Sequence, residues 1–150
     1  MIIRKINAFT SEHFDLLLSA DPNKHLVDDY LKRSFCFEAF ENDTVLGVLI
    51  LLPTRPETLE IVNIAVSQDH QGQGIGEQLI QFAFTQAREN AYNTVEIGTG
   101  STSFGQLYLY QKCGFRMTSI DHDFFIRHYD EEIVENKLVL KDMVRLSIDL

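Results

Sequence analysis

The sequence contains no tryptophan, only two cysteines and no long apolar run. The cysteines, Cys36 and Cys113, do not have the spacing of a metal site or a redox pair, so we expect free thiols in a reducing compartment. A membrane-spanning helix needs about 18 consecutive apolar residues, which no segment reaches. The start of the chain, Met1–Ile6, also lacks the basic and apolar regions of a secretory signal. We therefore expect a cytoplasmic protein with no membrane partner.

Basic residues are scarce, since 13 lysines and arginines face 22 aspartates and glutamates, for a formal net charge of −9. A nucleic-acid-binding protein normally presents a basic surface, so this balance argues against nucleic acid as a partner. Any anion must then be held by local donors rather than by the overall field. The same acidity suits a cationic substrate such as an amine, although it can also serve only solubility.

The length and composition are those of an ordinary globular protein. The chain has 150 residues, of which 45% are hydrophobic and 23% are charged, and this is enough for one substantial core. We find no repeat, low-complexity tract or linker. We therefore predict a single domain over residues 1–150.

Hydrophobic periodicity and turn residues predict a mixture of strands and helices. Strands are expected over residues 2–6, 35–41, 44–52, 58–66, 94–98, 115–120, 124–126 and 141–148. Helices are expected over residues 11–19, 24–33, 74–90 and 103–112, the last opened by a capping box of Ser103 and Gln106. Residues 53–56 should interrupt a strand, and residues 127–137 should be irregular and acidic. This order predicts an α/β (α+β) fold with a mixed sheet and helices packed on it.

The most informative segment combines a strand, a glycine-rich loop and a helix. The apolar strand Leu59–Val66 is followed by Gln71–Gly76 and then by an amphipathic run. Glycines let the backbone approach a ligand closely, and the N-terminus of a helix carries about half a positive charge. Free backbone N–H groups at this junction suit an anion, so we predict a ligand that carries phosphate.

Two common phosphate loops do not fit this segment. The nucleotide P-loop requires Gly-Lys-Ser/Thr, whereas Gly74 is followed by isoleucine and glycine. The dinucleotide fingerprint requires G-x-G-x-x-G directly after the strand, but Gly72, Gly74 and Gly76 are spaced two by two. The pattern Gln/Arg-x-x-Gly-x-Gly/Ala, in contrast, is met in full by Gln71, Gly74 and Gly76.

With this loop, the chain resembles the GNAT superfamily (GCN5-related N-acetyltransferases), which use acetyl-coenzyme A. Four features stand in the family's order: the strand Ile64–Val66, the pyrophosphate loop Gln71–Gly76, Ser101–Ser103 before the next helix, and Leu109–Phe115. The last is similar to the family signature Leu-Tyr-x-x-x-Gly-Phe. The resemblance covers residues 59–115 closely and the rest in the order of elements. It implies a GNAT-like acyl-CoA N-acyltransferase fold, with about four helices flanking a twisted, mostly antiparallel sheet of about seven strands.

The resemblance also implies a site for acetyl-coenzyme A. Backbone groups of Ile64, Ala65 and Val66 would pair with the pantetheine arm like an added strand, and the N–H of Ala65 or Val66 would polarise the thioester carbonyl. Ser103 stands where many relatives carry an asparagine that contacts the pantetheine, so it either replaces that contact or only caps the helix. The pyrophosphate would be held by the backbone of Gln71, Gly72, Gln73, Gly74, Ile75, Gly76 and Glu77.

Tyr110 and Glu60 are the candidate catalytic residues. Within the family signature, the phenol of Tyr110 would donate a proton or hydrogen bond to the departing thiolate; otherwise it is a core aromatic. Glu60 resembles the general base of the family's histone-acetylating branch, and strand alternation places it on the face of Val62 and Ile64 if no bulge intervenes. The alternatives for Glu60 are an exposed charge at the strand end, with a water chain as the base.

Three further side chains are candidate walls of the acceptor pocket. His122, Phe124 and Tyr129 lie near the region that holds the acceptor in the family. His122 and His128 would share a face of an extended strand, but no third ligand stands at metal-binding spacing, so we expect no metal.

The sequence therefore predicts an acetyl-coenzyme A-dependent N-acetyltransferase. It would acetylate a primary amine on a small molecule directly, without a covalent enzyme intermediate. Two alternatives stay open: a protein or peptide amine as the acceptor, and a non-catalytic acetyl-coenzyme A-binding module that regulates a partner. A homodimer also stays open, because the terminal strand can pair with a second copy.

Overall fold

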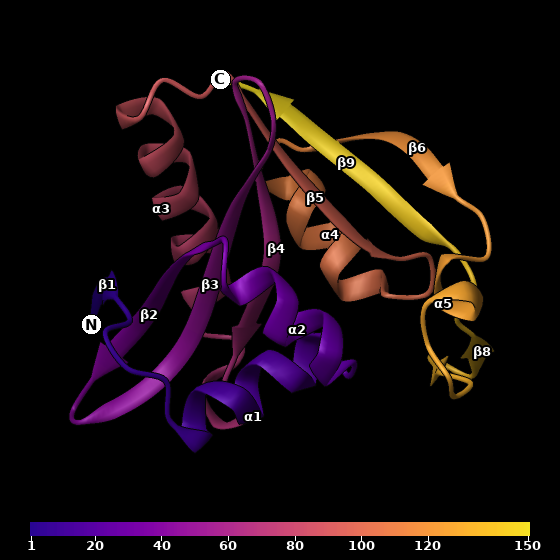
Figure 1. Ribbon diagram of the computed structural model, residues 1–150, viewed down its shortest axis with the longest axis horizontal. Coiled ribbons are helices and arrows are strands. Elements are labelled where there is room, and N and C mark those ends of the chain that lie inside the picture. The colour runs from indigo at the N-terminus through magenta and orange to yellow at the C-terminus, as the bar shows by residue number, and fades with distance from the viewer.

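The computed structural model describes all 150 residues, as nine strands, five α-helices and one short 3-10 helix (Figure 1). The strands are β1 (Ile2–Lys5), β2 (Phe35–Glu41), β3 (Thr44–Arg55), β4 (Thr58–Val66), β5 (Thr94–Gly100), β6 (Arg116–Asp121), β7 (Val134–Glu135), β8 (Leu138–Val139) and β9 (Met143–Asp149). The helices are α1 (Ser11–Ala20), α2 (Lys24–Leu31), α3 (Ile75–Glu89), α4 (Phe104–Lys112) and α5 (Phe124–Arg127), with the 3-10 helix at Gln68–His70.

One seven-stranded sheet, in the order β1-β2-β3-β4-β5-β9-β6, forms the centre of the molecule. β4 and β5 are parallel, and every other neighbouring pair in the sheet is antiparallel. β7 and β8 form a separate two-stranded ribbon. The predicted mixed, mostly antiparallel sheet of seven strands is confirmed, and the helices number one more than expected.

Helices cover both faces of this sheet (Figure 1). α1 and α2 pack on the face toward the viewer, and α3 and α4 pack on the face behind. The strands supply both layers, since Leu49 and Leu59 join the core under α3, whereas Val48 and Ala65 join the core under α1. Burial of each such leucine stabilises the fold by about 2 kcal/mol. None of the helices has the length and apolar character needed to cross a lipid bilayer.

Two segments that were predicted to lack regular structure contain strand residues. Residues 53–56 do not end β3, which runs through Pro53 to Arg55. Pro53 is exposed and its pairing with Leu59 lies beside a register shift, so the missing N–H of proline is tolerated there. Residues 127–137 are not wholly irregular either, because Asn136 and Lys137 have φ of 53° and 65° and turn β7 into β8.

Residues 124–126 form the short helix α5 rather than the predicted strand. Asp123 begins it with a left-handed φ of 62°, which breaks the extended chain. Arg127 then folds back on the turn, since its guanidinium donates to the oxygen of His122 at 2.5 Å and to Asp121 Oδ1 at 2.7 Å. These side-chain bonds override the weak strand preference of three apolar residues.

β4 carries a bulge in the middle of the sheet. Ile50 and Leu51 are consecutive on β3, but they pair with Asn63 and Ile61, so Val62 has no partner. A bulge of one residue reverses the alternation of side chains along a strand. The parallel pairing of β4 with β5 ends at the same level, with Ile61 opposite Ile97. Beyond this point, the edge of β4 that faces β5 has no strand partner.

A buried hydrogen bond fixes α1 to β2. His13 accepts a hydrogen bond from the N–H of Thr10 on Nδ1 at 2.9 Å, which leaves Nε2 to donate to Glu38 Oε1 at 2.6 Å. Arg4 donates to the other oxygen of Glu38 at 2.7 Å. Burial acts to raise the pKa of Glu38, but the bonds from His13 and Arg4 outweigh it and hold the pKa below its usual value.

Replacing Glu38 should therefore weaken the fold in a pH-dependent manner. We expect Glu38→Gln to lower the free energy of unfolding by about 2 kcal/mol at pH 7, because two charge-assisted hydrogen bonds are lost. A carboxylate with a lowered pKa in the folded chain stabilises above its unfolded pKa of about 4.3 and loses this effect as the pH falls further. Urea unfolding at several pH values measures the difference, which should shrink below about pH 4. Exposed Glu131→Gln is the control, and an equal change in both variants would contradict the account.

Candidate active site

The glycine-rich loop connects β4 to α3. Gly72 and Gly74 have φ of 78° and 81°, in the left-handed region where a side chain is strained. Gly74 is the N-cap of α3, which begins at Ile75 as predicted to within one residue. A Cβ on Gly72 or Gly74 would have no atom within 4 Å, so the loop presents bare backbone to the space outside.

The backbone N–H groups of this loop are free. No N–H from Gln71 through Glu77 donates a hydrogen bond within the chain, and the first helical bond runs from the N–H of Gln78 to the oxygen of Gly74. The dipole of the 15-residue helix α3 adds partial positive charge at this end. Lys112 Nζ, 3.5 Å from Glu77 Oε2, places a cation beside it. This set of donors suits an anion.

A groove of about 660 Å³ runs between the loop, the end of β4 and α4, and we call it the loop groove. Of the predicted cofactor residues, only Gln73 and Ser103 lie outside its lining, and Tyr110 lies within it. Glu60, His122, Phe124 and Tyr129 do not line it. The lining consists of Ser19, Ala20, Ile64, Ala65, Val66, His70, Gln71, Gly72, Gly74, Ile75, Gly76, Glu77, Gly105, Gln106, Leu109, Tyr110 and Lys112.

The end of β4 offers backbone to this groove. Ile64, Ala65 and Val66 pair with β3 on one side and have no strand on the side of β5. An extended ligand can add to such an edge as a strand does. The side chain of Gln71 donates to the oxygen of Val66 at 3.1 Å, which ties the loop to the end of the strand.

Tyr110 is both a core aromatic and a wall of the loop groove. Only 5% of the residue is exposed, and its ring lies 6.1 Å from that of Phe115. Its hydroxyl has no partner within the chain and is not shut off from the groove. Burial raises the pKa of Tyr110 far above its usual value, and Cys113 adds to the rise. The phenol therefore keeps its proton at neutral pH and is able to donate it.

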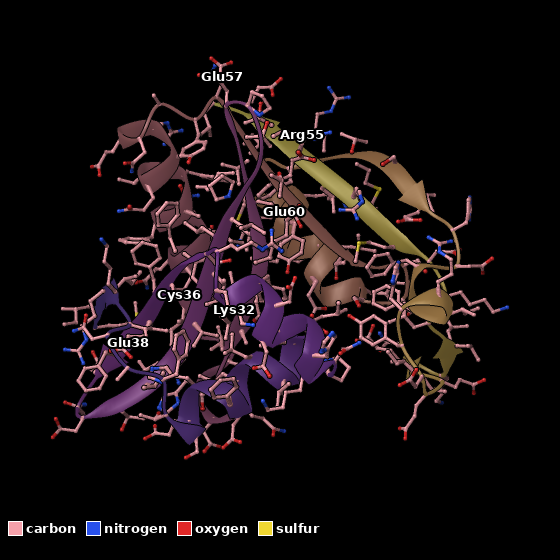
Figure 2. All side chains as sticks on the ribbon, viewed as in Figure 1. Lys32, Cys36, Glu38, Arg55, Glu57 and Glu60 are labelled. Atoms are coloured by element: carbon pink, nitrogen blue, oxygen red, sulfur yellow. The ribbon has the colours of Figure 1, made fainter.

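Glu60 lies on the other side of the sheet from Tyr110. Its neighbours along β4, Leu59 and Ile61, belong to the core under α3 and α4, so Glu60 faces the side of α1 and α2 (Figure 2). The bulge at Val62 intervenes, and Ile64 consequently faces the α3 side. The condition for the predicted shared face is therefore not met: Glu60 shares its face with Val62 but not with Ile64.

The surroundings of Glu60 favour its protonated form. The side chain is half-buried, and this burial raises the pKa of Glu60. Arg145 opposes the rise, Glu96 adds to it, and Arg55, which is hydrogen-bonded to Glu96, opposes it more weakly. A carboxylate whose pKa is raised toward neutrality is suited to accept and release a proton.

Ser103 does not cap α4, which corrects the predicted capping box. Its hydroxyl instead donates to Glu135 Oε1 at 2.5 Å, and Thr102 donates to the same oxygen at 3.2 Å. A hydroxyl that donates to a charged carboxylate makes a strong hydrogen bond, so the contact across 32 residues fixes the direction of the Ser103 side chain. Ser103 thereby holds the β7–β8 ribbon against the start of α4.

Two of the three predicted acceptor residues, Phe124 and Tyr129, lie in one aromatic cluster. His122 is exposed, with its Nδ1 3.6 Å from Asp142. Phe124 stacks on His128, with ring centroids 4.6 Å apart. Tyr129 lines a cavity of about 410 Å³ between the α1–α2 connection and residues 129–133. The ring of Tyr129 also lies 6.4 Å from that of Phe124, so the structure brings these two predicted residues together.

Sequence reasoning missed a polar network beneath α1 and α2. Asn63 Nδ2 donates to Tyr30 Oη at 2.9 Å, and Tyr30 donates to Asp21 Oδ2 at 3.5 Å. Tyr129 donates to Asp21 Oδ1 at 2.8 Å, and burial followed by the Asp21 charge raises the pKa of Tyr129 above its usual value. The available signal was Asn63, a lone polar residue within the apolar part of β4.

His70 was also missed as part of the site. It lines the loop groove, and its Nδ1 is buried with no hydrogen-bond partner. Buried polar nitrogens are nearly always paired, so an orphaned one at the wall of a groove points to a ligand.

Comparison with known proteins identifies the family to which this chain is related. The sequence profile described as "Acetyltransferase (GNAT) family" matches residues 5–115. The chain is 55% identical over 139 residues to the uncharacterized N-acetyltransferase YvbK of Bacillus subtilis. The alignment covers 93% of this chain and 90% of that relative.

Solved structures agree with the comparison of sequences. A Bacillus subtilis acetyltransferase crystallised in complex with CoA superposes with a TM-score of 0.95 at 53% identity, over 99% of this chain and 97% of that one. A GNAT family acetyltransferase from Elizabethkingia anophelis, with acetyl-CoA bound, gives a TM-score of 0.96 at 44% identity over the same shares. The chain therefore belongs to the GNAT family and is an acetyl-CoA-dependent acetyltransferase.

Proposed function

We propose that this enzyme transfers the acetyl group of acetyl-CoA directly to a primary amine of a small molecule. One observation carries the proposal: seven consecutive free N–H groups, from Gln71 through Glu77, stand at the mouth of a groove that leads to the phenol of Tyr110. Such a row of donors suits a diphosphate, and the groove beyond it suits a narrow apolar arm.

The residues present fit coenzyme A along its length. The N–H groups of the loop and Lys112 would hold the diphosphate, and the orphaned Nδ1 of His70 offers one more polar contact. The free edge of Ile64–Val66 would hold the pantetheine arm by backbone hydrogen bonds. When bound, acetyl-CoA supplies an acyl group activated as a thioester.

Two side chains account for the protons of the reaction. The acceptor amine has an ordinary pKa near 10 and must lose a proton before its nitrogen can attack the acyl carbon. Glu60, with its raised pKa, would take this proton, directly or through water. As the C–N bond forms and the C–S bond breaks, Tyr110 would give its proton to the departing sulfur. The nitrogen, which then carries one proton too many, would return a proton to Tyr110 through water and so restore the phenol. The products are an N-acetylated amine and a free thiol.

A covalent enzyme intermediate on cysteine is disfavoured. Burial raises the pKa of Cys113, Glu77 raises it further, and Lys112 only partly opposes them. Burial also raises the pKa of Cys36 to about 11. Neither thiol is paired with a base, whereas a nucleophilic cysteine needs a lowered pKa or such a partner.

Hydrogen bonds between the α1–α2 connection and the segment after α5 support a compact acceptor molecule. Tyr129 is bonded to Asp21, and Asn23 Nδ2 donates to the oxygen of His128 at 3.0 Å. These bonds close the α1–α2 connection against the segment that follows α5. An extended peptide would need this edge open, and an amine on a small molecule would not.

Tyr110→Phe tests the role of the phenol. We expect kcat to fall about 100-fold, because the leaving thiolate loses its proton donor, while the Kd for CoA stays unchanged. Thiol release measures the rate, with a panel of amines as acceptors, and calorimetry measures CoA binding. Tyr108→Phe, two residues earlier on α4 and 68% exposed, is the matched control. Equal rates in Tyr110→Phe and the wild type would refute a proton donor at this position.

The pH profile tests Glu60. Its deprotonated form must accept the proton, so kcat/KM should rise with pH through the raised pKa of Glu60, and Glu60→Gln should remove this limb. Glu96→Gln should shift the limb to lower pH, because Glu96 raises the pKa of Glu60 and also neutralises Arg55. An unchanged limb in Glu60→Gln would show that another group is the base.

A further inference from the structure

Arg145 occupies the middle of the sheet face that carries Glu60. Its neighbours along β9, Val144 and Leu146, are buried in the core under α3 and α4, so Arg145 points to the opposite face. α1 packs on β3 and β4 and leaves β5 and β9 uncovered on this side (Figure 1). We call this uncovered area around Arg145 and Glu60 the acceptor face.

The register places Arg145 beside the point where β4 and β5 separate. Their last parallel pair is Ile61 with Ile97, so Gly98 is the first residue of β5 beyond it. Arg145 lies directly opposite Gly98 on β9. The Met143 sulfur packs 2.8 Å from the position that a Cβ on Gly98 would take, which forms an apolar wall next to Arg145.

Arg145 makes no ion pair at contact distance, although its charge acts on Glu60 at longer range. The arginines without an ion pair are Arg88, Arg116 and Arg145. Arg88 and Arg116 are exposed, whereas Arg145 is partly buried. Among its neighbours, Arg55 already neutralises Glu96. The guanidinium of Arg145 is thus partly removed from water and free to bind an anion.

We propose that Arg145 anchors a carboxylate of the acceptor, so that the enzyme acetylates molecules that carry an amine and a carboxylate, such as amino acids. This rests on the proposed function and names its substrate class. A guanidinium binds a carboxylate through two parallel hydrogen bonds, and Glu60, on the same face, is then positioned to meet the amine. A phosphate dianion fits less well, because Glu60 and Glu96 both face this area.

Matched acceptors test the proposal. Thiol release from acetyl-CoA is measured with a panel of α-amino acids, the corresponding amino acid amides and the decarboxylated amines. We expect kcat/KM for the preferred amino acid to exceed that for its amide about 10- to 100-fold, the range of a charge-assisted bidentate contact. Arg145→Gln should abolish this preference by raising KM for the acid, whereas the shift of the Glu60 pH dependence caused by loss of the Arg145 charge should be the same for acid and amide. Arg145→Lys should keep part of the preference. Arg116→Gln, on the neighbouring strand β6, is the control.

Binding of the product provides a readout that needs no turnover. In the presence of CoA, calorimetry should give an N-acetylated amino acid a Kd at least about tenfold below that of its amide, and only with Arg145 intact. Equal binding or equal rates for acids and amides would overturn the proposal while leaving an N-acetyltransferase in place. A change in the pH profile of Arg145→Gln that is the same for acids and amides would show that Arg145 only tunes Glu60. Failure of every amine to be acetylated, with CoA still bound, would instead count against the proposed function.

Discussion

The interruption of pairing between β4 and β5 is the constraint on which the rest of the site depends. Backbone N–H and C=O groups that lack a partner cost free energy when water is excluded, so a sheet leaves an inner strand edge open only where something else can bind it. Here the open edge of Ile64–Val66 is followed, after the 3-10 helix Gln68–His70, by the free N–H groups of Gln71–Glu77. Both stretches bind through the backbone, which no side-chain substitution can easily remove.

The bulge in β4 divides the chemistry between the two faces of the sheet. Because Val62 has no partner on β3, Glu60 faces the side of α1 and α2, while Ile64 and Val66 face α3 and α4. Tyr110 and the loop groove belong to the second side, and Arg145 belongs with Glu60 to the first. Acetyl-CoA and the amine would therefore approach the same opening from opposite faces of the sheet. Tyr110, the proposed proton donor, and Glu60, the proposed proton acceptor, lie on these opposite faces.

The sequence predicted the elements that depend on local patterns and missed those that depend on distant contacts. The limits of β4 and the start of α3 followed from an apolar run and from glycines with positive φ. The helix α5 and the bond of Ser103 to Glu135 were not predictable, because both are decided by side chains that folding brings together. A bulge leaves no mark in the sequence, so the face of Glu60 relative to Ile64 could be predicted only on the condition that β4 is regular.

The most direct test of the account is amide hydrogen exchange at residues 71–77, followed by NMR. These N–H groups have no acceptor within the chain and should exchange fast in the free enzyme. Saturating CoA should slow them markedly, and pantetheine, which lacks the diphosphate, should leave them fast. Amides that remain fast in saturating CoA, or that are slow already in its absence, would contradict the claim that this loop holds the diphosphate.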